Sequence, residues 1–147
     1  MQPEALSGTL ANIADSLAIV MDPQSWEPVR GGDINQAGRL TDSNGRTWFI
    51  KFNNPDRVDM FAAECEGLRE LAIIENICVP QAAGYGKSEH FAWLVLEWLD
   101  LAGAPEVSDQ QLGQALARMH QITAGKFGWH RDNYIGTTTQ VNGWVSN

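Results

Sequence analysis

Lys51 and Glu64 are the two residues of this sequence whose types and spacing most clearly indicate chemistry. Lys51 lies near the end of an apolar run at 47–52 (TWFIKF), which is typical of a β-strand. Glu64 follows in a helical pattern, so that its carboxylate could hold the strand lysine in position. A lysine ammonium placed in this way binds phosphate oxygens in nucleotide-binding lobes.

Glu66 is the alternative partner for Lys51. The two carboxylates are two residues apart on the predicted helix, and therefore about 200° apart around its axis, so only one can face the strand. Glu66 diverges further than Glu64 from the apolar stripe of Phe61 and Cys65, and we therefore predict a Lys51 and Glu64 pair. The other interpretation is that both carboxylates are solvated. If the pair is buried, removing Lys51 should cost about 3 to 5 kcal/mol.

A pair of glycines lies upstream of Lys51. Because glycine has no Cβ, a glycine turn between two strands can bring backbone N–H groups close to an anion. Taken alone, two adjacent glycines are more typical of an ordinary hairpin turn. We predict a phosphate-covering loop formed by Gly31, Gly32, Asp33, Ile34 and Asn35.

The end of a later apolar strand is a candidate for contacts with a purine base. Backbone groups of Glu97, Trp98 and Leu99 could read the edge of a base, with Leu96 as an apolar wall. An ordinary strand end is the alternative interpretation of the same residues.

The first twenty residues predict an amphipathic helix. Pro3 suits a first helical turn, and apolar residues recur every three or four positions. The stripe consists of Leu6, Leu10, Ile13, Leu17 and Val20.

The middle of the chain predicts strands and one further helix. Two antiparallel strands are expected at about 28–41 and 46–52, with a tight turn at Asn44 and Gly45. A helix is expected at about 56–75, followed by strands at about 83–88 and 91–98. The run 92–96 is apolar throughout, which predicts burial on both faces of the sheet.

The last third predicts a single helix. A linker is expected at 101–105, and Ser108 with Gln111 forms a capping box that opens a helix. From Gly125 onward the sequence has no periodicity, which predicts a loop.

Composition excludes several classes of partner. The chain has 147 residues, a formal net charge of -8, and only 10 Lys and Arg residues, so we expect no nucleic-acid partner. It contains neither an apolar run of the roughly 18 residues that a membrane span needs nor a basic signal peptide. We therefore expect a cytoplasmic protein without a membrane partner. Cys65 falls on the apolar side of a helix, as a buried structural thiol does.

The C-terminal stretch combines Phe-Gly-Trp at 127–129 and Asp-Asn-Tyr-Ile-Gly at 132–136 with Gln140, Asn142 and Trp144. Upstream, the chain has Gly-Gly-Asp-Ile-Asn at 31–35 and Trp-Phe-Ile-Lys-Phe-Asn at 48–53. Over about residues 28–145 these motifs resemble the fructosamine and ketosamine kinases, which are related to the aminoglycoside phosphotransferases. The stretch from Phe-Gly-Trp to Asn-x-Trp separates this family from the aminoglycoside enzymes.

The resemblance implies an α+β fold, namely the N-terminal lobe of the protein-kinase-like fold. This lobe has an antiparallel sheet of about five strands and a helix bearing Glu64, preceded by an N-terminal helix. The first helix of the C-terminal lobe follows. Residues 1–99 would form the nucleotide-binding lobe, and 100–147 the hinge and the start of the C-terminal lobe.

The resemblance also implies an ATP-dependent transfer of the γ-phosphate to a hydroxyl of a sugar amine. Lys51 would hold the α and β phosphates, Glu64 would orient Lys51, and the 31–35 loop would cover the phosphates. Residues 97–99 would form the adenine hinge. Mg²⁺ is expected for the full-length family.

The family pattern continues with a His-Gly-Asp-Leu-Trp-Ser-Gly-Asn loop and a metal-binding Asp, and neither occurs in these 147 residues. We therefore expect no catalytic residue and no metal ligand in this chain, and no turnover by it alone. The alternatives are a non-catalytic nucleotide-binding or protein-interaction module, and half of a split aminoglycoside-phosphotransferase-like kinase. Apolar residues of 108–147, which the family packs on the C-terminal lobe, predict homo-oligomers.

Overall fold

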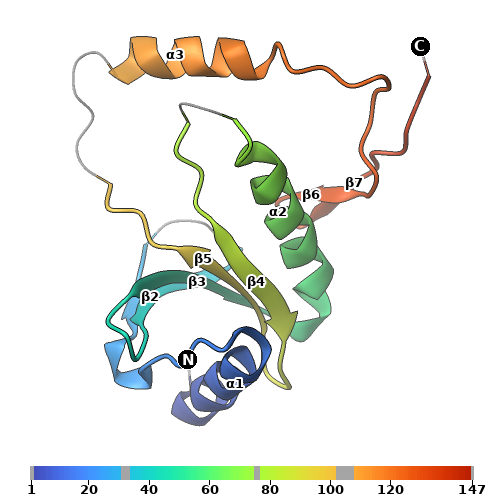
Figure 1. Cartoon of the computed structure of the whole chain (residues 1–147). Coiled ribbons are helices and arrows are strands. Elements are labelled where there is room, and N and C mark those ends of the chain that lie inside the picture. Colours follow the sequence, from blue (N-terminus) through green and yellow to red (C-terminus); the bar gives the residue numbers. More distant parts are fainter. Residues whose placement is uncertain (1, 31–33, 75–76, 102–107, 147) are drawn as a thin grey trace.

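The fold is a five-stranded antiparallel sheet with a helix on each face (Figure 1). The computed structural model describes residues 2–30, 34–74, 77–101 and 108–146. The strand order is β1-β2-β3-β5-β4, which confirms the predicted α+β class and the number of strands. The sheet consists of β1 (Glu27–Pro28), β2 (Gln36–Thr41), β3 (Thr47–Asn53), β4 (Ala82–Lys87) and β5 (Ala92–Glu97).

The strand predicted at 28–41 is in fact two strands. β1 and β2 pair as a hairpin, and the Val29 amide donates to the Ala37 carbonyl at 2.9 Å. The residues between the two strands include the glycine pair of the predicted loop. Residues 31–33 of the predicted loop lie outside the described residues.

The β2–β3 hairpin has the predicted tight turn. The Gly45 amide donates to the Asp42 carbonyl at 2.9 Å, and the Asp42 amide donates to the Arg46 carbonyl at 2.8 Å. The side chain of Asp42 also accepts hydrogen bonds from the amides of Asn44 and Arg46 and from Trp48 Nε1. These bonds stabilise the turn that precedes β3, the strand that contains Lys51.

Residues 92–96 of β5 are all buried, as predicted. Successive side chains of a strand point to opposite faces. Trp93 and Val95 belong to the core on the side of helix α1 (Pro3–Leu17), whereas Leu94 and Leu96 belong to the core on the side of helix α2 (Val58–Leu71).

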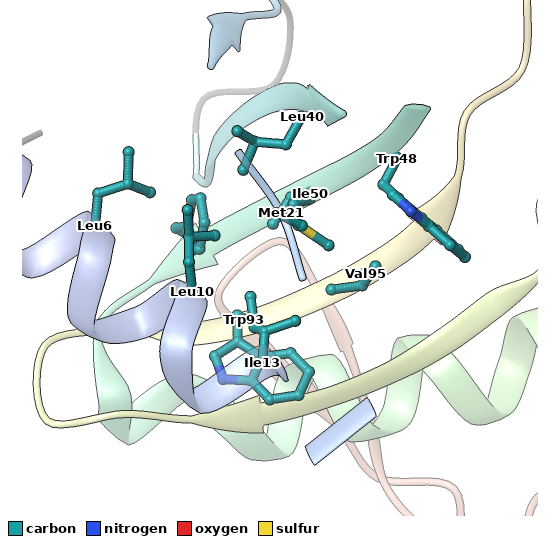
Figure 2. Close-up of a cluster of buried hydrophobic side chains, with 10 residues drawn as sticks. Leu6, Leu10, Ile13, Met21, Leu40, Trp48, Ile50, Trp93 and Val95 are labelled. Atoms are coloured by element: carbon teal, nitrogen blue, oxygen red, sulfur yellow. The ribbon is translucent and has the colours of Figure 1, made fainter. Parts of the chain in front are cut away.

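Helix α1 covers one face of the sheet (Figures 1 and 2). Figure 2 shows Leu6, Leu10 and Ile13 pointing from α1 toward Trp93 and the strand residues of this core. The helix ends at Leu17 because Ala18 adopts a left-handed conformation with φ 56°. The predicted stripe was therefore too long by one turn, and Val20 is exposed.

Helix α2 covers the opposite face. A 3-10 turn at Pro55–Arg57 precedes it, and a second 3-10 turn, Pro23–Ser25, lies near β1. The helix was predicted to continue to about residue 75, but it ends at Leu71. Beyond this point the Ile73 and Ile74 amides donate to carbonyls three residues back, which is 3-10 rather than α-helical geometry, and β-branched residues are weak helix formers.

The C-terminal part contains helix α3 (Ser108–Met119), as predicted, and a hairpin that was not predicted. Strands β6 (Asn133–Ile135) and β7 (Thr138–Gln140) pair antiparallel, so the prediction of a loop from residue 125 onward was wrong there. Gly136 has φ 63° at the turn, a conformation that glycine adopts without strain. In Figure 1 this hairpin lies beside α2, and α3 lies apart from the sheet.

Within the described residues, every helix is too short or too polar to cross a membrane. The predicted linker falls mostly on residues 102–105, which lie outside the described part of the chain.

Candidate functional site

Lys51 and Glu64 form an ion pair, as predicted. Lys51 Nζ lies 2.6 Å from Glu64 Oε1, and the two side chains are 23% and 30% exposed. Glu66 points to the other side of α2, where its carboxylate binds His130 and Arg131. The pair thus lies half-buried between the central strand β3 and α2, with some access to solvent.

The position of Glu64 follows from the way α2 packs. Met60, Phe61 and Cys65 are buried against Leu94 and Leu96 of β5. Glu64 follows Phe61 by almost one turn, so it borders the face that meets the sheet. Burial raises the pKa of the Cys65 thiol, and Cys65 therefore acts as a buried apolar side chain, as expected.

A cavity of about 570 Å³ opens beside the ion pair. The sheet, α2 and the segment after β5 enclose it, and apolar side chains form most of its walls. Its lining residues are Val29, Phe49, Lys51, Glu64, Leu68, Pro80 and Leu96 to Leu101. The structure thus brings Lys51, Glu64, Glu97, Trp98 and Leu99 together around one space, although they come from three elements.

The strand end at Glu97 is tied to the segment before β4. The Glu97 amide donates to the Gln81 carbonyl at 2.8 Å, and Glu97 Oε2 accepts from the Gln81 amide at 3.3 Å. The amide of Glu97 is therefore already used. The next three residues, Trp98, Leu99 and Asp100, also line the cavity.

Trp98 is held by neighbours on three sides. The Arg39 guanidinium lies 5.5 Å from the centre of its ring, and the Phe49 ring lies 6.3 Å away. Trp98 Nε1 donates to Asp100 Oδ1 at 2.8 Å. These contacts connect β2, β3 and the segment after β5, and Phe49, Trp98 and Asp100 line the cavity.

Ile34 and Asn35, at the end of the predicted glycine loop, lie at a second cavity. Asn53 Nδ2 donates to Asn35 Oδ1 at 2.6 Å and to the Ile34 carbonyl at 3.2 Å, which fixes this end of the loop on β3. The second cavity, of about 620 Å³, lies between α2 and residues 128–136. Glu64 and Leu68 line both cavities, so the ion pair stands between them.

Phe49 and Leu68 are site residues that the sequence interpretation did not assign. Phe49 precedes Lys51 by two positions on β3 and therefore lies on the same face of the sheet. Leu68 follows Glu64 by one helical turn. Both residues could have been found from the sequence. Strand periodicity places Phe49 beside Lys51, and helix periodicity places Leu68 beside Glu64.

Comparisons with known proteins agree with this geometry. The family model for fructosamine kinase matches residues 7–147. A probable ketoamine kinase of Synechocystis sp. is 39% identical over 123 residues, which cover 83% of this chain and 41% of the relative. The protein-ribulosamine 3-kinase of Arabidopsis thaliana is 33% identical over 121 residues, which cover 80% of this chain and 36% of the relative.

Solved structures show the same fold. A candidate fructosamine-3-kinase of Haemophilus somnus superposes with a TM-score of 0.82 at 26% identity, covering 96% of this chain and 48% of that protein. A macrolide 2'-phosphotransferase of Brachybacterium faecium superposes with a TM-score of 0.58 at 20% identity, covering 83% of this chain and 45% of that protein, which supports the fold alone. The fold is the N-terminal lobe of the protein-kinase-like fold with the first helix of the C-terminal lobe.

The chain spans less than half the length of each of these relatives. The match to the family model nevertheless covers almost all of its residues, and it includes every residue around the cavity. The chain therefore belongs to the fructosamine kinase family.

Proposed function

We propose that this chain is the nucleotide-binding lobe of a kinase that acts on sugar amines, and that it binds ATP in the cavity beside Lys51. The observation that supports this most directly is the 2.6 Å ion pair between Lys51 and Glu64 at the wall of a largely apolar cavity. An apolar cavity with a few convergent polar groups is the usual form of a small-molecule site.

The apolar end of the cavity suits the adenine base. Phe49, Leu68 and Leu96 line it, and an aromatic ring offers a stacking surface for a base. The backbone of residues 98–100 lies at the same end, where its amide and carbonyl groups can read the edge of the base.

The charged end suits the phosphates. The Lys51 ammonium can bind phosphate oxygens while Glu64 fixes its direction. The 31–35 loop begins after β1, and its last residue, Asn35, is fixed on β3 by Asn53. We propose that this loop covers the phosphates, as the resemblance to the family implies.

Mg²⁺ is the metal that the family implies. In the part of the chain that the structure describes, His, Cys, Asp and Glu residues do not gather in threes where an ion could be held. The residues present therefore do not fit a complete magnesium site, and we assign no metal ligand and no step through the metal.

The reaction follows from the names of the relatives, which are described as ketoamine, ribulosamine and fructosamine kinases. We propose that residues 1–99 bind the nucleotide and that 100–147 form the hinge and the start of the second lobe. We further propose that the 147 residues alone bind ATP without transferring its γ-phosphate, since the catalytic loop motif of the family does not occur in their sequence.

Self-association is part of the same proposal. Apolar side chains of α3 and of residues 122–145 are exposed, and apolar surface of this kind is typical of interfaces. The side chains are Leu112, Leu116, Ile122, Phe127, Val141, Trp144 and Val145.

Calorimetric titration with ATP tests the proposed function. We expect saturable binding by the unchanged chain and by Lys87→Ala, whose lysine is exposed on β4. Lys51→Ala should bind at least tenfold more weakly, because about 1.4 kcal/mol of phosphate contact suffices for a factor of ten. Absence of binding by the unchanged chain at millimolar ATP would favour a protein-interaction module.

A phosphate-transfer assay tests the proposal that the 147 residues alone do not transfer the γ-phosphate. Transfer to a fructosamine that depends on Mg²⁺ and disappears in Lys51→Ala would contradict the proposal that these 147 residues are inactive alone. No transfer, together with ATP binding, is the expected result.

A further inference from the structure

The outer side of α2 is held by residues from far along the chain. Three of its carboxylates, Asp59, Glu66 and Glu70, each accept a hydrogen bond from the segment 129–134. We refer to these contacts as the α2 clasp. The donors on the segment are Trp129, His130, Arg131 and Tyr134.

Arg131 is at the centre of the clasp. Its Nη1 donates to Glu66 Oε1 at 2.7 Å, and its Nη2 donates to Asp59 Oδ1. The Arg131 side chain is 21% exposed, so water screens this charge cluster only in part. Burial alone would lower the pKa of Arg131, but Asp59 and Glu66 raise it, and the guanidinium stays charged.

The other donors extend the clasp in both directions along α2. Trp129 Nε1 donates to Glu70 Oε1 at 2.7 Å, and the Tyr134 hydroxyl donates to Asp59 Oδ2 at 2.9 Å. These two carboxylates are eleven residues apart, which is about three turns of helix. The clasp therefore fixes most of the length of α2.

The clasp and the Lys51 pair act on opposite sides of one rigid helix. Glu64 and Glu66 are two residues apart, which places them about 200° apart around the axis. A helix moves as a unit, so a rotation of α2 that releases Glu66 from Arg131 also moves Glu64 away from Lys51.

We infer that Arg131 is a positioning residue: by holding Glu66 and Asp59 it keeps α2 in the rotation that pairs Glu64 with Lys51. Its effect on nucleotide affinity rests on the proposed function, whereas its effect on the Lys51 pair does not. The segment 129–134 thus positions Lys51, which lies on the opposite side of α2.

Acylation of lysines by an amine-reactive reagent, read by mass spectrometry, reports on the pair directly. The Lys51 ammonium is hydrogen-bonded and its side chain is 23% exposed, so the reagent reaches it slowly while the pair is intact. The other two lysines of the chain, Lys87 and Lys126, are exposed and serve as internal references.

In Arg131→Ala we expect the rate of Lys51 acylation, relative to the two reference lysines, to rise about three- to tenfold. Arg131→Lys retains a cation and should recover part of the effect. Arg118→Ala removes an exposed arginine of α3 and should leave the rate unchanged. Circular dichroism shows whether each variant is folded. If Arg131→Ala does not fold, Glu66→Gln replaces it and should raise the rate in the same direction.

Combining Arg131→Ala with Glu64→Gln shows whether Arg131 acts through Glu64. In Glu64→Gln the lysine has already lost its charged partner, so adding Arg131→Ala should produce no further rise. A further rise there, or an unchanged Lys51 rate in a folded Arg131→Ala, would overturn the inference.

ATP affinity separates this inference from the proposed function. We expect Arg131→Ala to bind ATP about three- to tenfold more weakly than the unchanged chain. If the unchanged chain binds no ATP, the proposed function fails, and the acylation rates still decide the role of Arg131. If it binds ATP and Arg131→Ala binds equally well, the positioning role is wrong while the proposed function stands.

Discussion

Phe49 and Lys51 present their side chains to the same cavity from alternate positions of β3. The ring of Phe49 lies toward Trp98, and the ammonium of Lys51 lies toward Glu64. Since residues i and i+2 of a strand share a face, one short stretch of strand supplies both an apolar surface and a positive charge. A ligand with a flat base at one end and phosphates at the other would use both.

Replacing Phe49 should weaken nucleotide binding without removing it. Stacking of a base on an aromatic ring contributes about 1 to 3 kcal/mol, so we expect Phe49→Ala to raise the Kd for ATP at least fivefold. Phe49→Tyr keeps the ring and should bind almost normally. Phe127→Ala removes an exposed ring remote from this cavity and is the matched control. Equal ATP affinity of Phe49→Ala and the unchanged chain would exclude Phe49 as the stacking surface.

The ion pair between Lys51 and Glu64 should contribute only modestly to the free energy of unfolding. The sequence interpretation gave about 3 to 5 kcal/mol for a buried pair, but the two side chains are 23% and 30% exposed. Water reaches the carboxylate when its partner is removed, so we expect Lys51→Ala to lower the free energy of unfolding by about 1 kcal/mol. Urea denaturation measures this, with Lys87→Ala as control. A loss above about 3 kcal/mol would mean that the pair behaves as a fully buried one.

Asp42 should make the stability of the sheet depend on pH. Burial raises the pKa of Asp42, but hydrogen bonds from Trp48 and from the backbone of Arg46 and Asn44 lower it by more, so that the pKa lies below that of a free aspartate. A carboxyl whose pKa is depressed by folding stabilises the fold above its unfolded pKa, and this contribution is lost as the pH falls through the folded pKa.

We therefore expect Asp42→Asn to reduce the free energy of unfolding by about 1 to 2 kcal/mol at pH 7. The difference from the unchanged chain should shrink as the pH falls below about 4. Asp15→Asn, an exposed residue of α1, controls for the loss of one negative charge. A difference that is constant between about pH 7 and pH 3 would show that the Asp42 charge does not contribute.

Gly128 should be required for the pairing of residues 127–129 with residues 142–145, which we call the C-terminal ribbon. It has φ 112°, and a Cβ at this position would lie 2.7 Å from the Gly143 carbonyl oxygen. The neighbouring residues are paired across the ribbon, because the Trp129 amide donates to Asn142 and the Val145 amide donates to Phe127. Gly128→Ala should therefore open the ribbon locally at a cost of about 1 to 3 kcal/mol.

Hydrogen exchange of the Trp129 and Val145 amides measures this opening. We expect faster exchange in Gly128→Ala, while amides of β3 and β5 remain protected. Gly125→Ala is the matched control, since a Cβ there meets no atom within 4 Å. Unchanged exchange at both ribbon amides would mean that the backbone accommodates the methyl group.

The elements with a clear hydrophobic periodicity could be predicted from the sequence. The stripe from Leu6 to Leu17 and the apolar run 92–96 appear where they were predicted, and the helix bearing Glu64 does so except for its last turn. The Lys51 and Glu64 pair was also predictable, because helix geometry allows only one of two nearby carboxylates to face the strand.

The parts that could not be predicted depend on contacts between distant residues. Strands β6 and β7 have three residues each, which is too short for an alternation of apolar and polar residues to be recognised. Arg131 lies 65 positions from Glu66, and nothing in the local sequence indicates that the two meet. The same is true of the bond from Trp129 to Glu70, which spans 59 positions.

The apolar surface of α3 should make the chain associate with itself. Leu112 and Leu116 are one turn apart on the same face, and their side chains are 54% and 37% exposed. Burying such side chains between two copies removes apolar area from water at about 25 cal/mol per Å². We expect the sedimentation coefficient to rise with protein concentration and the variant with both Leu112→Asp and Leu116→Asp to remain a monomer. Val20→Asp, an exposed apolar residue after α1, should associate like the unchanged chain. A single monomeric species of the unchanged chain at every concentration would mean that this surface does not bind a second copy.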